Sequence, residues 1–89
     1  MRKILVVEDE DAIREVVALN LRLAGYEVTE AASAEQALAV FSPSAGFDVA
    51  VLDIMLPGMN GFSLCETIRR DSASIGIIIL SAKTLETDK

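Results

Sequence analysis

Four short strand-like segments alternate with three segments of helical periodicity, and this alternation constrains the fold of the 89-residue chain most strongly. Three of the four are apolar runs rich in β-branched residues, and the second alternates apolar with polar residues. The expected strands are Ile4–Val7, Glu27–Ala31, Val49–Asp53 and Ile75–Leu80. Strands that alternate with single helices form right-handed βαβ units, and continuous apolar strands are typical of parallel sheets. The pattern therefore predicts an α/β fold with a parallel sheet, and it leaves the strand order open.

The segments between the strands carry helix start and stop signals. The expected helices run from Asp11 to Ala24, from Ser33 to Phe41 and from Gly61 to Asp71. We predict Asp11 as the N-cap of the first helix and Gly25 as its stop. Ser33, with Gln36 three residues later, fits a capping box for the second helix. Residues 42–46 are predicted to form a loop.

Length and hydropathy indicate one small domain over residues 1–89 with a modest core. The mean hydropathy of +0.42 is high, but no apolar run approaches the length of a membrane span. The start, Met1-Arg2-Lys3, precedes only four apolar residues before Glu8, which is too short for the apolar region of a signal peptide. We therefore expect a cytoplasmic protein with no membrane segment.

The charge distribution argues against direct nucleic-acid binding by this segment. The net charge is −6, and the chain lacks the clustered Lys and Arg that such binding needs. Histidine is absent, which removes the commonest general base and the commonest zinc ligand. Cys65 is the single cysteine, so no intramolecular disulfide can form, and we expect it to be a small buried apolar residue in a helix.

Acidic side chains follow two of the predicted strands directly. Asp53 ends the third strand ahead of a turn rich in Pro, Gly and Asn at 57–61, and Glu8 and Asp9 follow the first strand. Ser81 follows the fourth strand. Because ligands bind at the carboxyl ends of parallel strands, we expect these side chains to share one edge of the sheet. Each also has a simpler explanation alone: acids favour helix N-termini, Asp53 could cap a turn, and Ser81 could merely end a strand.

This arrangement fits phosphoryl transfer to a carboxylate. An Asp can act as a nucleophile and form an acyl phosphate, and Mg²⁺ offsets the repulsion between the acids and the phosphoryl group. Mg²⁺ prefers one or two carboxylates and several waters, which suits direct coordination by Asp9 and Asp53. Glu8 could coordinate directly or through water, and the backbone carbonyl of Met55 could complete the shell. The Ser81 hydroxyl could hydrogen-bond a phosphoryl oxygen.

Four segments together resemble the receiver domain of bacterial two-component response regulators. They are ILVVEDE at 4–10, GYEV at 25–28, DVAVLDIMLPGMNG at 48–61 and IILSAK at 78–83, and in order they cover nearly the whole chain. The resemblance implies a flavodoxin-like three-layer αβα sandwich with strand order 2-1-3-4-5. It implies that Asp53 accepts a phosphoryl group from a histidine kinase. It further implies that Glu8 and Asp9 serve the Mg²⁺ site and that Ser81 reorients on phosphorylation.

The stretch Leu56–Gly61 is most similar to regulators that carry a winged-helix DNA-binding output domain, which is therefore an expected partner in the full-length protein. The chain also departs from the family. The family lysine after the fifth strand and the aromatic switch residue on that strand have no counterpart, and Lys83 does not match that lysine. About a quarter of a receiver of ordinary size (~100–150 residues) is missing, including strand five and the last helix. The final stretch, Ala82–Lys89, is polar and could begin a helix.

These departures leave three functions open. The preferred one is a signalling phosphoacceptor that transfers and hydrolyses only its own phosphoryl group and is not otherwise an enzyme. The second is a phosphorylation-impaired, receiver-like interaction module. The third is an Asp-nucleophile phosphatase, which needs an acid two residues after the nucleophile, where Met55 stands. The uncovered strand Ile77–Leu80 also predicts homo-oligomerisation or strand exchange.

Overall fold

Four parallel strands form one sheet in the order β2-β1-β3-β4. The computed structural model describes residues 2–53, 56, 61–72 and 74–80. Within them the strands are β1 (Lys3–Val7), β2 (Glu27–Ala31), β3 (Val49–Asp53) and β4 (Gly76–Leu80). The helices are α1 (Asp11–Leu23), α2 (Ala34–Val40) and α3 (Gly61–Asp71), with a 3-10 turn, η1, at Pro43–Ala45. The predicted α/β class and the strand order 2-1-3-4 are confirmed.

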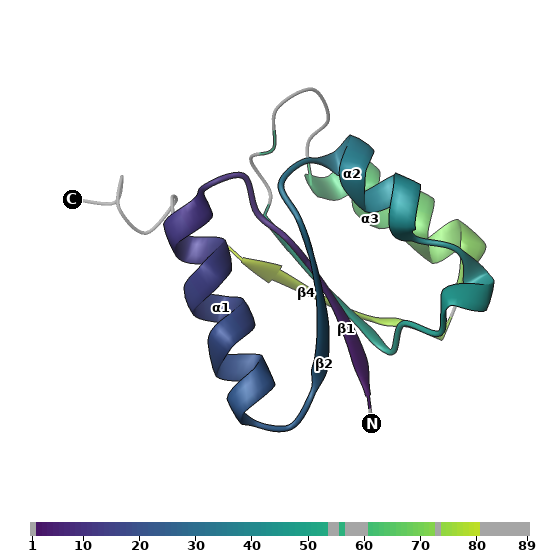
Figure 1. The fold of residues 1–89 in the computed structure, drawn as a ribbon. Coiled ribbons are helices and arrows are strands. Elements are labelled where there is room, and N and C mark those ends of the chain that lie inside the picture. The colour runs from purple at the N-terminus through teal and green to yellow at the C-terminus, as the bar shows by residue number, and fades with distance from the viewer. Residues whose placement is uncertain (1, 54–55, 57–60, 73, 81–89) are drawn as a thin grey trace.

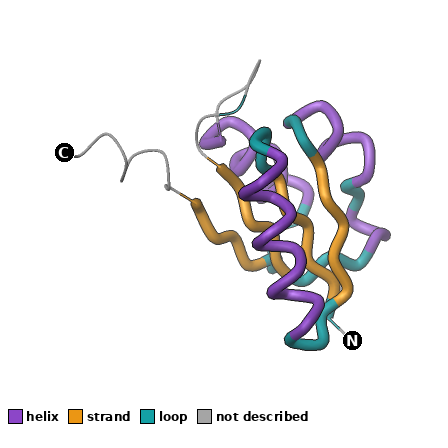
Figure 2. The backbone as a smooth tube through the Cα atoms, turned by 60° about the vertical axis from the view of Figure 1, so that its left-hand side comes forward, coloured by secondary structure: helices purple, strands orange, loops and turns teal. Residues whose placement is uncertain are grey.

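The helices cover both faces of the sheet, which gives three layers. α1 lies on one face, and α2 and α3 lie on the other (Figure 1). The same division is visible in Figure 2, where α1 crosses in front of the strands and the other helices lie beyond them. Each right-handed crossover between parallel strands places its helix on one face of the sheet. Which face it is depends on the direction in which the chain moves across the sheet. Among the described helices, none is long and apolar enough to cross a membrane.

Alternation along β1 divides the apolar core into two parts, because successive strand residues point to opposite faces. Leu5 and Val7 belong to the larger cluster, under α2 and α3. Ile4 and Val6 belong to a smaller cluster against α1. Each fully buried Leu, Ile or Val side chain contributes about 1.5–3 kcal/mol relative to its exposed state. These side chains hold β1 at the centre of the sheet, with its carboxyl end fixed between two neighbouring strands.

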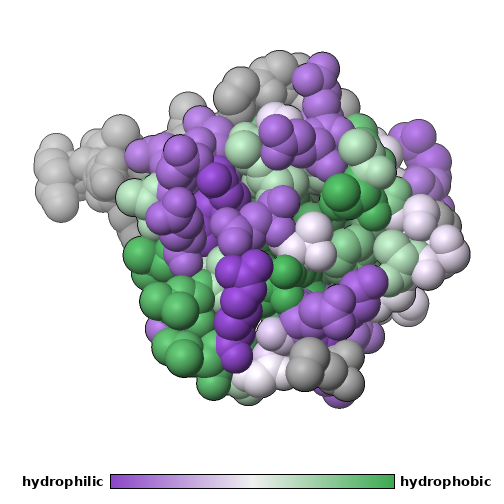
Figure 3. All heavy atoms as spheres, in the orientation of Figure 1, coloured by the Kyte–Doolittle hydropathy of each residue, from purple (hydrophilic) through white to green (hydrophobic). Residues whose placement is uncertain are grey.

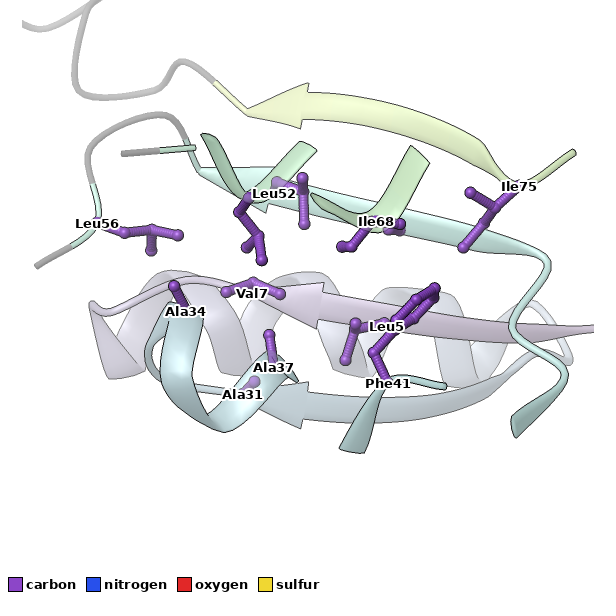
Figure 4. Packing of buried hydrophobic residues seen from close by; sticks show 12 residues of the cluster. Leu5, Val7, Ala31, Ala34, Ala37, Phe41, Leu52, Leu56, Ile68 and Ile75 are labelled. Carbon is purple, nitrogen blue, oxygen red and sulfur yellow. The ribbon is translucent and has the colours of Figure 1, made fainter. Parts of the chain in front are cut away.

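The larger cluster brings α2 close to the sheet through small side chains. Figure 4 shows Ala34 and Ala37 of α2 facing Val7 and Ala31 of the sheet. All of these residues have at most 1% of their surface exposed. Alanine ends at its Cβ, so the helix backbone can approach the strands without displacing larger side chains. On the α3 side, Ile68 packs into the same cluster.

The first helix confirms its predicted stop and corrects its predicted start. Gly25 has φ +99°, and its backbone N–H donates to the carbonyl of Arg22, while Tyr26 N–H donates to the carbonyl of Leu21. This pair of bonds is the Schellman motif, which needs a left-handed residue that glycine supplies without strain. The predicted N-cap, Asp11, is wrong. Glu10 is the N-cap, with extended backbone, and Asp11 is the first helical residue, where its charge complements the helix dipole.

The second helix begins at the predicted cap. Ser33 Oγ accepts from Gln36 N–H at 3.1 Å. The return bond differs from a standard capping box, because Gln36 Oε1 accepts from Ala32 N–H at 2.9 Å and not from the cap residue itself. The helix ends at Val40, and Phe41 is its extended C-cap. The first two helices therefore each end one residue before their predicted ends.

The remaining described elements follow their predictions with small differences. The predicted loop at 42–46 contains the η1 turn. The fourth strand begins at Gly76, although Ile75, its predicted first residue, is buried. Cys65 lies on α3 as expected, but it is only half-buried at the border of the larger cluster. The predicted final helix at 82–89 lies outside the described residues.

Candidate functional site

Three carboxylates from two strand ends gather at one edge of the sheet. Glu8, Asp9 and Asp53 each offer one oxygen, and these atoms lie within 4.8 Å of one another. Strand register explains the meeting, because Val7 of β1 pairs with Leu52 of β3, so the residues that follow them are neighbours. Glu8 is 1% exposed and Asp53 is 2% exposed, which is unusual for acids. The predicted convergence of acids is therefore present.

Hydrogen bonds fix the position of Glu8 on both its backbone and its side chain. Its N–H donates to the carbonyl of Ala31 at 3.1 Å, which continues the β1–β2 ladder by one residue. Its carboxylate Oε2 accepts from Glu10 N–H at 2.9 Å. Its backbone carbonyl accepts from Nη1 of Arg14 at 2.9 Å. The side chain is thereby held at the edge where Asp53 ends β3.

Electrostatics favour a cation at this cluster. Two ionised carboxylates at 4.8 Å repel each other by on the order of 3 kcal/mol at an effective dielectric constant of about 20. A divalent cation between them turns the repulsion into attraction. The guanidinium of Arg14 does not fill this role, because its side chain pairs with Asp11 and Glu30. The hydrogen bond to Asp11 is the largest cause that raises the pKa of Arg14, so the guanidinium stays charged.

The donor set fits Mg²⁺. Carboxylate oxygens are the ligands that this ion prefers, at about 2.0–2.1 Å, so oxygens on opposite sides of one ion lie about 4.2 Å apart. The oxygens of Glu8, Asp9 and Asp53 lie within 4.8 Å, and small side-chain movements or one bridging water would close the difference. Zinc prefers His and Cys, and the chain has no His. The three acids could therefore hold a hard divalent cation.

The other two predicted site residues lie outside the described part of the chain. They are Met55, expected to offer its backbone carbonyl, and Ser81, expected to offer its hydroxyl.

Arg14 was not anticipated at this site. Its signal in the sequence was a basic residue three positions after Asp11, at a spacing that brings side chains together on a helix.

The sequence matches the family model described as the response regulator receiver domain over residues 4–89. The chain belongs to this receiver domain family. The receiver domain is 46% identical over 95 residues to "Alkaline phosphatase synthesis transcriptional regulatory protein SphR" of Synechococcus elongatus, with 98% of this chain and 37% of the relative covered. It is 40% identical over 94 residues to "DNA-binding dual master transcriptional regulator RpaA" of a Synechocystis species, with 100% of this chain and 37% of the relative covered. The receiver domain thus spans little more than a third of these relatives.

Solved structures agree with this assignment. The response regulator TrrA of Thermotoga maritima, in complex with Mg²⁺-BeF, superposes with a TM-score of 0.86 at 38% identity, covering 99% of this receiver domain and 76% of that chain. The complex of the histidine kinase ThkA with TrrA gives a TM-score of 0.84 at 40% identity, covering 92% and 70%. The predicted family and its flavodoxin-like fold are confirmed.

Proposed function

We propose that Asp53 is the phosphoacceptor of this receiver domain and that a histidine kinase supplies the phosphoryl group. The main support is the cluster of Glu8, Asp9 and Asp53, in which Glu8 and Asp53 are buried, at the carboxyl edge of a parallel sheet. In a relative, a regulator of this family occurs in complex with a histidine kinase. A carboxylate oxygen of Asp53 attacks the phosphorus of a phosphohistidine. The new O–P bond forms as the P–N bond breaks, and the electron pair leaves with the imidazole.

Glu8, Asp9 and Asp53 are the proposed metal ligands, with the backbone carbonyl of Met55 completing the set. When bound, Mg²⁺ neutralises charge on the phosphoryl oxygens as they approach the acids. Burial of Asp53 limits the water that could compete with the donor, and the register of β1 and β3 fixes its carboxylate beside Glu8. A regulator in the family has been solved with Mg²⁺-BeF, which supports this assignment. We further propose that Ser81 hydrogen-bonds a phosphoryl oxygen.

A DNA-binding output domain is the proposed recipient of the signal in the full-length protein. The support is that relatives of which this chain covers 37% are named as transcriptional regulators. The net charge of −6 and the lack of clustered Lys and Arg in the sequence argue against DNA binding by this segment, so contact with DNA would fall to another domain. We propose the winged-helix type, on the resemblance of Leu56–Gly61.

Intact-mass measurement tests the proposed function. The gene product that contains this chain is incubated with Mg²⁺ and acetyl phosphate, and one phosphoryl adduct is expected. D53N should abolish the adduct, whereas D71N, a matched change at an exposed acid on α3, should retain it. An adduct that survives D53N would contradict the assignment, and no adduct at all would favour an interaction module. Steady turnover of a phosphate ester that depends on Asp53 would favour a phosphatase.

A further inference from the structure

Arg14 joins three elements around the acidic site with one guanidinium. Its Nη1 donates to the backbone carbonyl of Glu8 at 2.9 Å, just beyond β1. Its Nε donates to Glu30 Oε1 on β2 at 3.3 Å, and its Nη2 donates to Asp11 Oδ1 in the first turn of α1 at 2.6 Å. The Arg14 side chain is only 13% exposed, and its contacts with Glu8 and Glu30 are partly buried, whereas its partner Asp11 is 77% exposed.

The first backbone bond of α1 also begins at Arg14. Arg14 N–H donates to the carbonyl of Glu10 at 3.0 Å, and any residue but proline at this position would keep that bond, so the side chain alone distinguishes the variants. One residue therefore bonds the carbonyls of Glu8 and Glu10, which flank Asp9. Two of the three acids of the proposed metal site, Glu8 and Asp9, lie in the segment between these anchors. The acid from β3, Asp53, is held differently, because it is the last residue of its strand and pairs with Leu80 of β4.

We propose that Arg14 is a positioning residue for the acidic site, which fixes the turn that carries Glu8 and Asp9. This inference rests on the proposed metal site and extends it to a residue that touches neither metal nor phosphoryl group. The planar guanidinium presents donors in a rigid fork, so it can bond acceptors on three elements at once. A lysine ammonium is a compact point charge on a flexible stem and cannot reproduce this geometry.

The positive charge of Arg14 and its positioning role would have opposite effects on Mg²⁺ affinity. A cation beside a metal site repels the metal, so its removal should tighten binding if charge dominated. Arg14 is instead paired with two carboxylates, those of Asp11 and Glu30, which offset its charge. Residues that orient metal ligands typically weaken metal affinity by 10–100-fold when changed. Removal of Arg14 should therefore weaken binding because the turn loses its anchor.

The test measures Mg²⁺ affinity in the gene product that contains this chain, for wild type, R14Q, R14K and the control R22Q. Arg22 also pairs with Glu30, but it lies two turns further along α1, and its second hydrogen bond goes to the carbonyl of Val28 on β2. R14Q should weaken Mg²⁺ binding about tenfold, R14K should remain several-fold weaker than wild type, and R22Q should stay within about twofold. Unchanged or tighter binding in folded R14Q, or full recovery in R14K, would overturn the proposal.

Hydrogen exchange without metal separates this proposal from the proposed function. Glu10 N–H donates to Glu8 Oε2, so its exchange reports the order of the turn itself. It should exchange roughly threefold faster or more in R14Q and be unchanged in R22Q. Equal exchange rates of Glu10 N–H in R14Q and R22Q would overturn the positioning role, even if Mg²⁺ binds. Absence of Mg²⁺ binding in wild type, with faster exchange in R14Q, would instead count against the metal site alone. If R14Q does not fold, E30A removes one partner of Arg14 and should give a smaller change in the same direction.

Discussion

Glu8 and Asp53 lie side by side because Val7 pairs with Leu52 across β1 and β3. Both residues are buried, at 1% and 2% exposure, so two neighbouring carboxylates have little contact with solvent. A fold gains nothing from such an arrangement, since buried charges of like sign cost free energy. The cost is consistent with a site that is kept for chemistry and not for stability.

Asp9 offers a direct test of that cost. D9N removes one of the three like charges, so without metal it should raise the free energy of unfolding by on the order of 1–3 kcal/mol. The same change should remove most of the stabilisation that Mg²⁺ gives, because a ligand is lost. Urea unfolding with and without Mg²⁺ measures both effects. The exposed control D71N should change the free energy by less than about 0.5 kcal/mol. A destabilised D9N in metal-free buffer would contradict the account.

The close approach of α2 to the sheet depends on Ala37, which has no exposed surface. A37L would place three extra carbons where Ala31 and Val7 already fill the space, and overpacking of this kind costs about 1–3 kcal/mol. Thermal or urea unfolding measures the loss. A39L adds the same atoms on the exposed side of α2 and should change stability little. Equal stability of the two variants would show that α2 does not pack as described.

Strand β4 is the last strand of the sheet in the part of the chain that the structure describes. Its Ile78 is 54% exposed, on a strand rich in isoleucine. We expect the 89-residue chain to self-associate through this strand, because an apolar strand at a sheet edge is a template for pairing. Light scattering across a concentration series should show association, and I78K should reduce it. A stable monomer at high concentration would contradict this expectation.

A second apolar surface lies elsewhere, on the outer side of α1. Figure 3 shows apolar side chains gathered over the C-terminal half of this helix, where Leu19 and Leu23 are exposed. L23Q is therefore the matched control for I78K. It should leave association through β4 unchanged, and an equal loss of association in both variants would place the contact on α1.

The strands and their shared edge could be predicted from the sequence because each depends on a local pattern. The apolar run before Glu8 and the run that ends at Asp53 give strands, and the βαβ rule then brings their carboxyl ends together. The N-cap of α1 could not be predicted, because Glu10 and Asp11 are both acids and the choice between them depends on the extended backbone at Glu10. No side-chain type specifies that conformation.

The role of Arg14 could not be predicted for a different reason. Its partner Glu30 lies on β2, sixteen residues away, and reaches α1 only through the register in which Val6 pairs with Glu30. Local spacing indicates the bond to Asp11 and nothing beyond it. The assignments of Met55 and Ser81 lie outside the described residues and stay predictions.

The most direct test of the central claim locates the phosphoryl group on the chain. After phosphorylation with acetyl phosphate and Mg²⁺, borohydride reduces an aspartyl phosphate to homoserine, and trypsin releases the peptide that runs from Leu23 to Arg69. Fragmentation of this peptide should place the homoserine at position 53, with Asp48 in the same peptide unchanged. Homoserine at position 48, or an unmodified peptide from protein that carries a phosphoryl adduct, would contradict Asp53 as the acceptor.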